Sequence, residues 1–80
     1  MNTPEAISAR LTAAVADAIK MAGLSQRAVS EQTGIPLVTL SRRLTGRTAF
    51  TVIELAAIAQ VLNLSLVELA VRAERVRDAA

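Results

Sequence analysis

Several residue types on which many enzymes depend are missing from this sequence. It has no cysteine and no histidine, which removes disulfides, thiolate nucleophiles and the commonest general bases and metal ligands. Its seven carboxylates are scattered, and the close pair Glu74 and Asp78 stands among arginines, as on a solvated helix face. We therefore predict that the protein is not an enzyme and uses no cofactor, metal or small-molecule ligand.

Aromatic, glycine and proline residues are also scarce. Phe50 is the one aromatic side chain, and 3 glycines and 2 prolines are too few for a chain of many tight turns. The longest apolar run, residues 55–59, is far shorter than the roughly 20 residues that span a bilayer. Charged residues interrupt the N-terminal apolar pattern, so we expect no signal peptide and no membrane partner. With 80 residues, the chain allows one domain, 1–80.

Helix start and stop signals recur along the chain and predict five helices. Thr51 and Ser65 are each followed three residues later by a glutamate, which is the pattern of a capping box. Pro4 suits the first position of a helix, and no segment shows sustained strand alternation. The expected N-caps are Thr3, Ser25, Thr51 and Ser65. The expected helix-ending glycines are Gly23, Gly34 and Gly46.

Apolar residues at helical spacing indicate which sides of the helices face the core. In the first helix these are Ile7, Leu11, Ala14, Val15, Ala18, Ile19 and Ala22. In the fourth, Ile53, Ala56, Ala57 and Val61 lie near one face, which Leu55, Ile58 and Leu62 broaden. Phe50 is expected to fill the core rather than to stack on a base.

Basic charge is concentrated in the middle of the chain. Residues 25–50 carry four arginines against Glu31 alone, so four minus one gives +3, whereas the whole chain is +2. The four are Arg27, Arg42, Arg43 and Arg47. This distribution is a modest electrostatic signature of nucleic-acid binding.

The same segment predicts two short helices joined by a glycine turn. The first covers roughly Gln26–Gln32, the second Pro36–Thr45, and Gly34 supplies the turn. Small Ala28 permits close approach of the helices. Val29, Ile35 and Leu40 are apolar at positions that would face the corner. A corner of this kind lets its second helix enter a DNA major groove while the first crosses the backbone.

The run from Leu24 to Leu62 resembles the helix-turn-helix domain of phage repressors and Cro proteins, the XRE-like or lambda repressor-like family. The matching features are Ser25-Gln26, Ala28-Val29, Gly34-Ile35, Thr39-Leu40-Ser41-Arg42, Gly46 and Glu54-Leu55 with Ile58-Ala59 and Leu62. The resemblance implies a compact all-α domain of five helices, with the helix-turn-helix formed by the second and third. The segment SRRLTGR is similar to segments found in regulators of actinobacterial phages.

Two departures from the family pattern bear on the recognition helix. Pro36 stands where the family usually has a Ser or Thr cap, and proline cannot accept amide hydrogen bonds in that way. Arg43 and Leu44 occupy places that often hold an apolar residue and then Glu, so the inward position moves to Leu44 and Arg43 becomes free to reach phosphate.

The resemblance also implies a set of base-reading residues. Leu37 and Val38 stand where such repressors place base-reading side chains, and an aliphatic there can pack on the thymine methyl. The alternative is that one of the two belongs to the core. Thr39 can touch a base or a phosphate, or simply lie on the helix surface, and Ser41 faces the corner or solvent. Arg42 suits a bidentate contact to guanine; the alternative is a solvated or phosphate-bound arginine.

Other polar residues are candidates for contacts to the DNA backbone, which position a protein without reading sequence. Gln26 and the amide groups at the start of its helix can bind a phosphate directly, although simple exposure of Gln26 is the alternative. The candidate phosphate contacts are Ser25, Gln26, Arg27, Arg43, Arg47 and Thr48.

The C-terminal helix, expected at 65–78, has the apolar rhythm of a coiled-coil seam. From Leu62, apolar residues follow at steps of four, three, four and three. This predicts a homodimer through Leu66, Leu69, Ala73 and Val76. The alternative is that residues 66–70 pack on the domain's own core, and both can hold for different parts of the helix.

Together these observations predict a sequence-specific double-stranded DNA-binding transcription regulator of Cro-like or repressor type. Its partner would be an operator, and it would work in the cytoplasm of a bacterial or phage-infected cell, at the nucleoid. The alternatives on the same fold are a protein-interaction module, such as an antitoxin or an anti-repressor, and an excisionase-like architectural DNA-binding protein.

Overall fold

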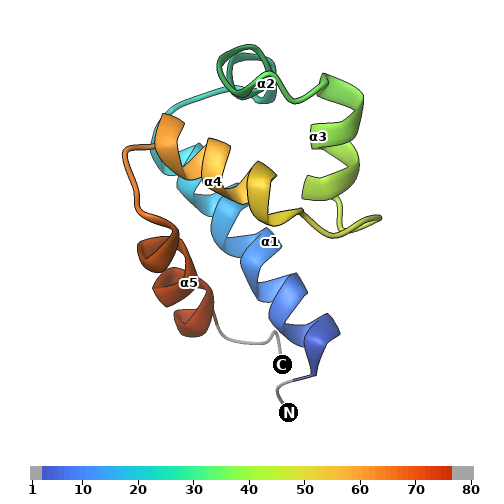
Figure 1. Ribbon diagram of the computed structural model, residues 1–80, viewed down its shortest axis with the longest axis vertical. Coiled ribbons are helices and arrows are strands. Elements are labelled where there is room, and N and C mark those ends of the chain that lie inside the picture. Colours follow the sequence, from blue (N-terminus) through green and yellow to red (C-terminus); the bar gives the residue numbers. More distant parts are fainter. Residues whose placement is uncertain (1–2, 77–80) are drawn as a thin grey trace.

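The computed structural model describes residues 3–76 and shows five helices and no strand in that range (Figure 1). The helices are α1 (Pro4–Met21), α2 (Gln26–Thr33), α3 (Leu37–Leu44), α4 (Val52–Val61) and α5 (Leu66–Arg75). This confirms the predicted all-α class and the five-helix order. Positions 77 and 78 of the predicted C-terminal helix lie outside the described residues.

Side-chain caps begin four of the helices, as predicted. Hydroxyl oxygens of Thr3, Ser25, Thr51 and Ser65 each accept an N–H from the residue three positions on, at 3.0–3.1 Å. At α4 the capping box is complete, because Glu54 Oε1 also accepts the Thr51 N–H at 2.9 Å. Pro36 precedes α3 without a side-chain cap, as its chemistry requires.

The core draws on all five helices and on the helix-turn-helix turn. Its buried members are Val15, Ile19, Val29, Ile35, Leu40, Leu55, Ile58, Ala59 and Leu69. Phe50 is half-buried and packs against this cluster. α1 runs through the middle of the molecule beside α5, while α2 and α3 lie at its other end (Figure 1). No polar or charged residue in the described range is buried, so the core itself is built from apolar packing alone.

The predicted inward face of α4 is partly wrong. Leu55 and Ile58 are buried, as predicted, and Ala59 is buried with them, but Ile53 is 82% exposed and Ala56 is also exposed. Nearly every residue of this helix is apolar, so its sequence has little polar contrast from which to choose a face. The packing against α2 and α5 makes the choice instead.

The predicted seam of α5 needs a similar correction. Leu69 is 0% exposed and Ala73 is 5% exposed, because this side of the helix packs within the protein's own core and against α1. These two residues cannot meet a second subunit. Leu66 is 41% exposed, and Val76, which follows the helix, is half-buried.

Two of the first helix's predicted inward residues also lie outside the core. Ile7 is exposed near the start of α1, and Ala22 is exposed just after its end. Ile7 lines a hollow beside Phe50 and Val52 at the start of α4, and Ala22 is the residue that caps the end of α1.

Within residues 3–76, no single helix is long and apolar enough to cross a membrane. α4 and α5 meet that length and composition when they are taken together, with a bend of 98° between them.

Candidate nucleic-acid interface

The turn between α2 and α3 is held by its backbone geometry. Gly34 ends α2 at φ +80°, in the left-handed region that favours glycine, and its N–H donates to Ser30 O at 2.9 Å. Ile35 then turns its side chain into the core, and Pro36 leads directly into α3. The predicted corner is therefore present, with Val29, Ile35 and Leu40 buried at its centre.

Two hydroxyl groups fasten this turn further, and sequence reasoning missed both. Ser30 Oγ donates to Ile35 O at 2.6 Å. Thr33 Oγ1 donates to Val29 O at 2.7 Å and accepts the Ile35 N–H at 3.2 Å. The available signal was the presence of hydroxyl residues within the last turn before Gly34, where they can bond free backbone groups. The turn is thus fixed from both sides, which sets the direction of α3.

A shallow depression of about 760 Å³ lies between the start of α2 and the outer side of α3. We call it the α2–α3 depression. Its lining residues are Gln26, Arg27, Leu37, Val38, Ser41, Arg42, Thr45 and Arg47. Six of these eight were predicted as DNA contacts, and Ser41 and Thr45 add two hydroxyls that were not. Residues from two helices and the following loop thus meet on one surface.

The exposure of the side chains along α3 shows whether Leu37 and Val38 face the core. Leu40 is the buried residue of this helix, at 0% exposure. Val38 is 65% exposed, so most of its side chain is available to a ligand. Leu37 is half-buried and lines the α2–α3 depression. Val38 therefore presents the larger apolar surface.

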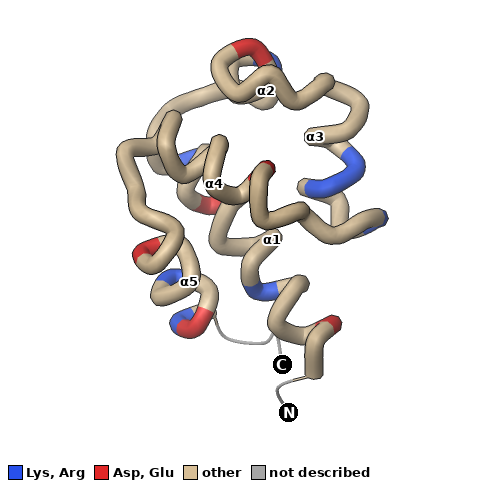
Figure 2. Tube along the Cα trace, viewed as in Figure 1, with Lys and Arg blue, Asp and Glu red and all other residues tan. Residues whose placement is uncertain are grey.

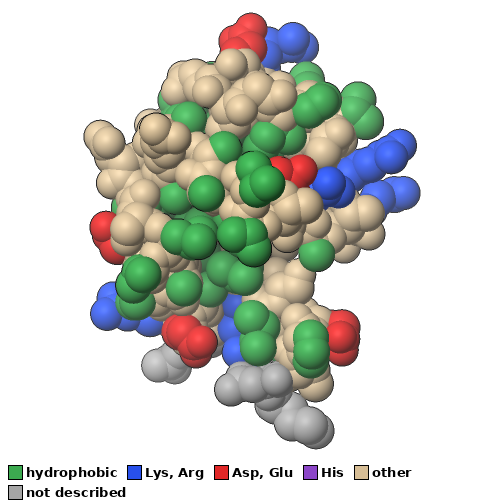
Figure 3. Space-filling model, in the orientation of Figure 1, with side chains coloured by type: hydrophobic (Ala, Val, Ile, Leu, Met, Phe, Trp, Pro, Cys, Tyr) green, Lys and Arg blue, Asp and Glu red, His purple; other side chains and the backbone are tan. Residues whose placement is uncertain are grey.

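Three arginines of the depression are exposed. Within residues 3–76, Arg27, Arg42 and Arg47 form no ion pair with a carboxylate. Figure 2 shows basic positions on the last turn of α3 and on the loop after it, and in Figure 3 basic side chains project from this edge. Arg42 lies one helical turn after Val38, so the two share a side of α3. The result is an apolar and basic surface of the composition that DNA contacts require.

Arg43 is engaged inside the protein. Its Nε donates to Glu54 Oε1 at 2.8 Å, its Nη2 donates to Glu54 Oε2 at 3.2 Å, and its Nη1 donates to Thr48 Oγ1. The hydrogen bond from Arg43 lowers the pKa of the Glu54 carboxyl, and the same bond raises the pKa of Arg43. The expectation that Arg43 is free to reach phosphate therefore needs correction, because its guanidinium already has partners on α4 and in the loop.

Three further candidates lie outside the depression. Ser25 caps α2 through its hydroxyl oxygen, immediately beside Gln26. Thr39 is half-buried on another side of α3. Thr48 is exposed in the loop after α3 and accepts the hydrogen bond from Arg43.

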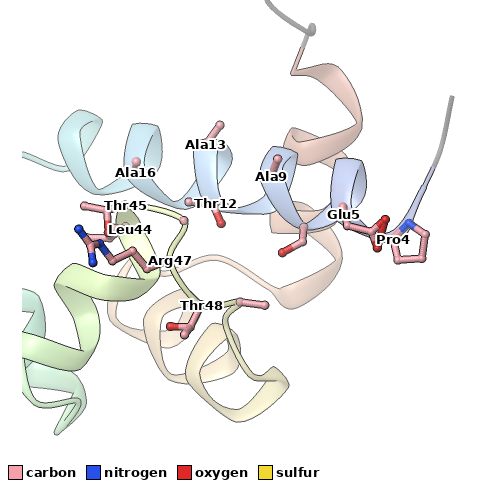
Figure 4. A pocket seen from close by; sticks show the side chains of 13 residues that line it. Pro4, Glu5, Ala9, Thr12, Ala13, Ala16, Leu44, Thr45, Arg47 and Thr48 are labelled. Atoms are coloured by element: carbon pink, nitrogen blue, oxygen red, sulfur yellow. The ribbon is translucent and has the colours of Figure 1, made fainter.

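A second hollow lies on the other side of this loop. It is about 710 Å³ in volume and is bounded by small side chains of α1, including Ala9, Thr12 and Ala13, by Leu44 at the end of α3 and by loop residues 45–49 (Figure 4). Thr45 and Arg47 line both hollows. The loop therefore stands as a ridge between two depressions, which leaves Arg47 accessible to a large ligand.

The model of the helix-turn-helix family matches residues 15–69, which include all of α2, α3 and α4. Neither a curated protein nor a solved structure matches the chain significantly. The family match covers more than half of the chain and contains the whole α2–α3 depression. The chain thus belongs to the helix-turn-helix family of XRE-like, lambda repressor-like regulators, which bind double-stranded DNA.

Proposed function

We propose that the protein is a sequence-specific regulator of Cro-like or repressor type, which occupies an operator through the predicted recognition helix Pro36–Thr45 and thereby blocks polymerase. One observation carries this proposal: the α2–α3 depression gathers exposed Val38, Arg42 and Arg47 beside the start of α2. Acting on an operator, it would work at the nucleoid of its host cell.

Base reading falls to the outer side of α3. Val38, assisted by Leu37, can pack on a thymine methyl, which is the apolar feature of the major groove. Arg42 is exposed one turn later and can donate two hydrogen bonds to guanine O6 and N7. Ser41 and Thr45 lie on the same surface and can bond either a base edge or a phosphate. Thr39, half-buried at the side, remains a candidate for a flanking contact.

Phosphate contacts fall to the rim of the depression. Gln26 and Arg27 form the first turn of α2, where free N–H groups and the helix dipole favour an anion. The Ser25 hydroxyl uses its oxygen as the cap and keeps its hydrogen for donation. Arg47 and Thr48 extend the rim along the loop after α3. These contacts would fix the register of α3 on the duplex.

We extend the proposal to a homodimer, which would match a two-fold symmetric operator. Leu66, Val67 and Val71 of α5 are exposed, and Figure 3 shows hydrophobic side chains gathered over α4 and α5 on the face in view. We propose that these three residues and Val76 contact a second copy, in place of the predicted seam that included the buried Leu69 and Ala73. Sedimentation of wild type and Val67→Lys would test it: a dimer that survives this substitution, or a wild-type monomer at high concentration, contradicts the surface.

A salt titration tests the DNA-binding function itself. Binding to a mixed-sequence duplex should weaken steeply as salt rises, with a slope of log K against log salt near −0.9 for each phosphate neutralised by a lysine or arginine. Negligible binding at low salt would refute the proposal and favour a protein partner. A footprint on genomic fragments would then give the operator, its spacing and its symmetry.

A further inference from the structure

A line of side-chain contacts joins the start of α4 to the loop after α3. Glu54 lies on α4, Arg43 on α3 and Thr48 in the loop. Arg43 donates to both carboxylate oxygens of Glu54 and, through Nη1, to the hydroxyl oxygen of Thr48. The guanidinium of Arg43 therefore ties α3 to both the loop that follows it and the start of α4.

Glu54 is the fixed end of this line. Its Oε1 accepts the Thr51 N–H at 2.9 Å, while its own N–H donates to Thr51 Oγ1 at 3.1 Å. The next residue, Leu55, is buried in the core. The carboxylate is thus held by the first turn of a helix that is itself anchored, and it gives Arg43 a fixed partner.

Arg43 is directed away from the DNA-facing surface. Three of its five N–H groups are donated within the protein, and it does not line the α2–α3 depression. Arg42 precedes it by one residue, which is about 100° around the helix, and is exposed in that depression. The two adjacent arginines therefore serve different surfaces.

Thr48 is the outward end of the line. A hydroxyl is both an acceptor and a donor. Since its oxygen accepts from Arg43, its hydrogen must point away from the guanidinium. A cationic donor on the oxygen also polarises the O–H bond and makes it a stronger donor. Thr48 is exposed beside Arg47, on the ridge that borders the depression.

We infer that Arg43 is a positioning residue for DNA binding that acts through Thr48: Glu54 fixes Arg43, and Arg43 directs the Thr48 hydroxyl hydrogen toward a phosphate of the DNA backbone. The inference rests on the proposed DNA-binding function. It assigns Arg43 an indirect role in place of a direct phosphate contact.

The test compares Arg43→Met, Thr48→Val and the double variant with a matched control, Arg47→Gln, in salt titrations against a mixed-sequence duplex. Arg43→Met and Thr48→Val should each weaken binding by about tenfold, the loss of one hydrogen bond to a charged group. The double variant should lose no more than either single variant. The salt slope of Thr48→Val should equal that of wild type because a hydroxyl carries no charge, and the slope of Arg43→Met should stay close to it because an arginine paired with Glu54 neutralises no phosphate. Arg47→Gln should reduce the slope by about 0.9 per subunit.

Several outcomes would overturn the inference. A slope reduction in Arg43→Met equal to that of Arg47→Gln would mean that Arg43 contacts phosphate directly. Multiplicative losses in the double variant would mean that Arg43 and Thr48 act independently. Wild-type binding that is itself absent refutes the proposed function, whereas wild-type binding with an unchanged Arg43→Met variant refutes this inference alone.

Arg43→Lys is a control that separates a loss of DNA binding from a loss of folding. It keeps the charge, but a single ammonium cannot reproduce the planar fork that bonds Glu54 and Thr48 together. Its circular dichroism should match wild type, and its DNA affinity should fall about as far as that of Arg43→Met. Full binding by a folded Arg43→Lys would show that the charge alone is required, against the inference.

Discussion

Replacing Leu40 and Val38 in turn should separate the stability of the recognition helix from its contact with DNA. Leu40 is fully buried, so Leu40→Ala removes core contacts and leaves a cavity, at a cost of about 2–5 kcal/mol. Val38 is 65% exposed, and Val38→Ala should change the free energy of unfolding by less than about 0.5 kcal/mol.

The size of the Leu40 effect is large for this domain. At roughly 0.05–0.15 kcal/mol per residue, a chain of 80 residues has a stability of about 4–12 kcal/mol. Leu40→Ala would remove a third or more of that stability in most of the range. Because Leu40 is the buried residue of α3, the loss should begin at this helix.

Urea denaturation of both variants, followed by circular dichroism, gives the two free energies. Binding to operator variants that differ in one thymine gives the second half of the comparison: Val38→Ala should lose discrimination at a thymine position, and a folded Leu40→Ala should keep it. Equal destabilisation by the two substitutions would refute the assignment of the faces of α3. Unchanged discrimination in Val38→Ala would refute its role as a methyl reader.

Three further predictions concern Arg42, Gly34 and Glu54. Arg42→Ala should reduce discrimination at one or two base positions by about 1–3 kcal/mol, measured with single-base operator variants; unchanged relative affinities would contradict base reading. Gly34→Ala should destabilise the fold by about 1–2 kcal/mol in urea denaturation, because φ is +80° although no atom obstructs an added Cβ. Gly34→Asn should cost less, and equal costs would argue against backbone strain. Since Arg43 lowers the pKa of Glu54 below its ordinary value of 4.5, the stability from this carboxylate is present above that value and is lost as the pH falls through the lowered pKa. Glu54→Gln should remove that part of the acid sensitivity, and an unchanged difference between the two proteins from pH 6 to 3 would contradict the linkage.

Features governed by adjacent residues could be predicted from the sequence. Thr51 and Glu54 specify a capping box because the two groups meet whenever a helix starts there. Gly34 specifies the turn for the same kind of local reason. The gathering of Gln26, Val38 and Arg42 on one surface followed from the family resemblance, which supplied the angle between α2 and α3 that spacing alone does not contain.

Features that depend on packing between helices could not be predicted. Arg43 meets Glu54 across 11 positions, and only the placement of α3 against α4 brings them together. The apolar spacing around Leu69 fits a coiled-coil seam, but it fits equally well a helix that packs on the core of its own domain, as α5 does. Ile53 lies in a helix that is apolar on nearly all sides, so the spacing of its apolar residues does not indicate which side faces the core.

The single buried anchor of α3 has a consequence for how such a regulator changes over evolutionary time. Leu40 holds the helix in the core, while Val38 and Arg42 are exposed and form no part of it. Substitutions at these two positions can therefore accumulate without loss of the fold. Under the proposed function, exchanging a few of these surface side chains would give the protein a new operator, and a designer could retarget it by the same route.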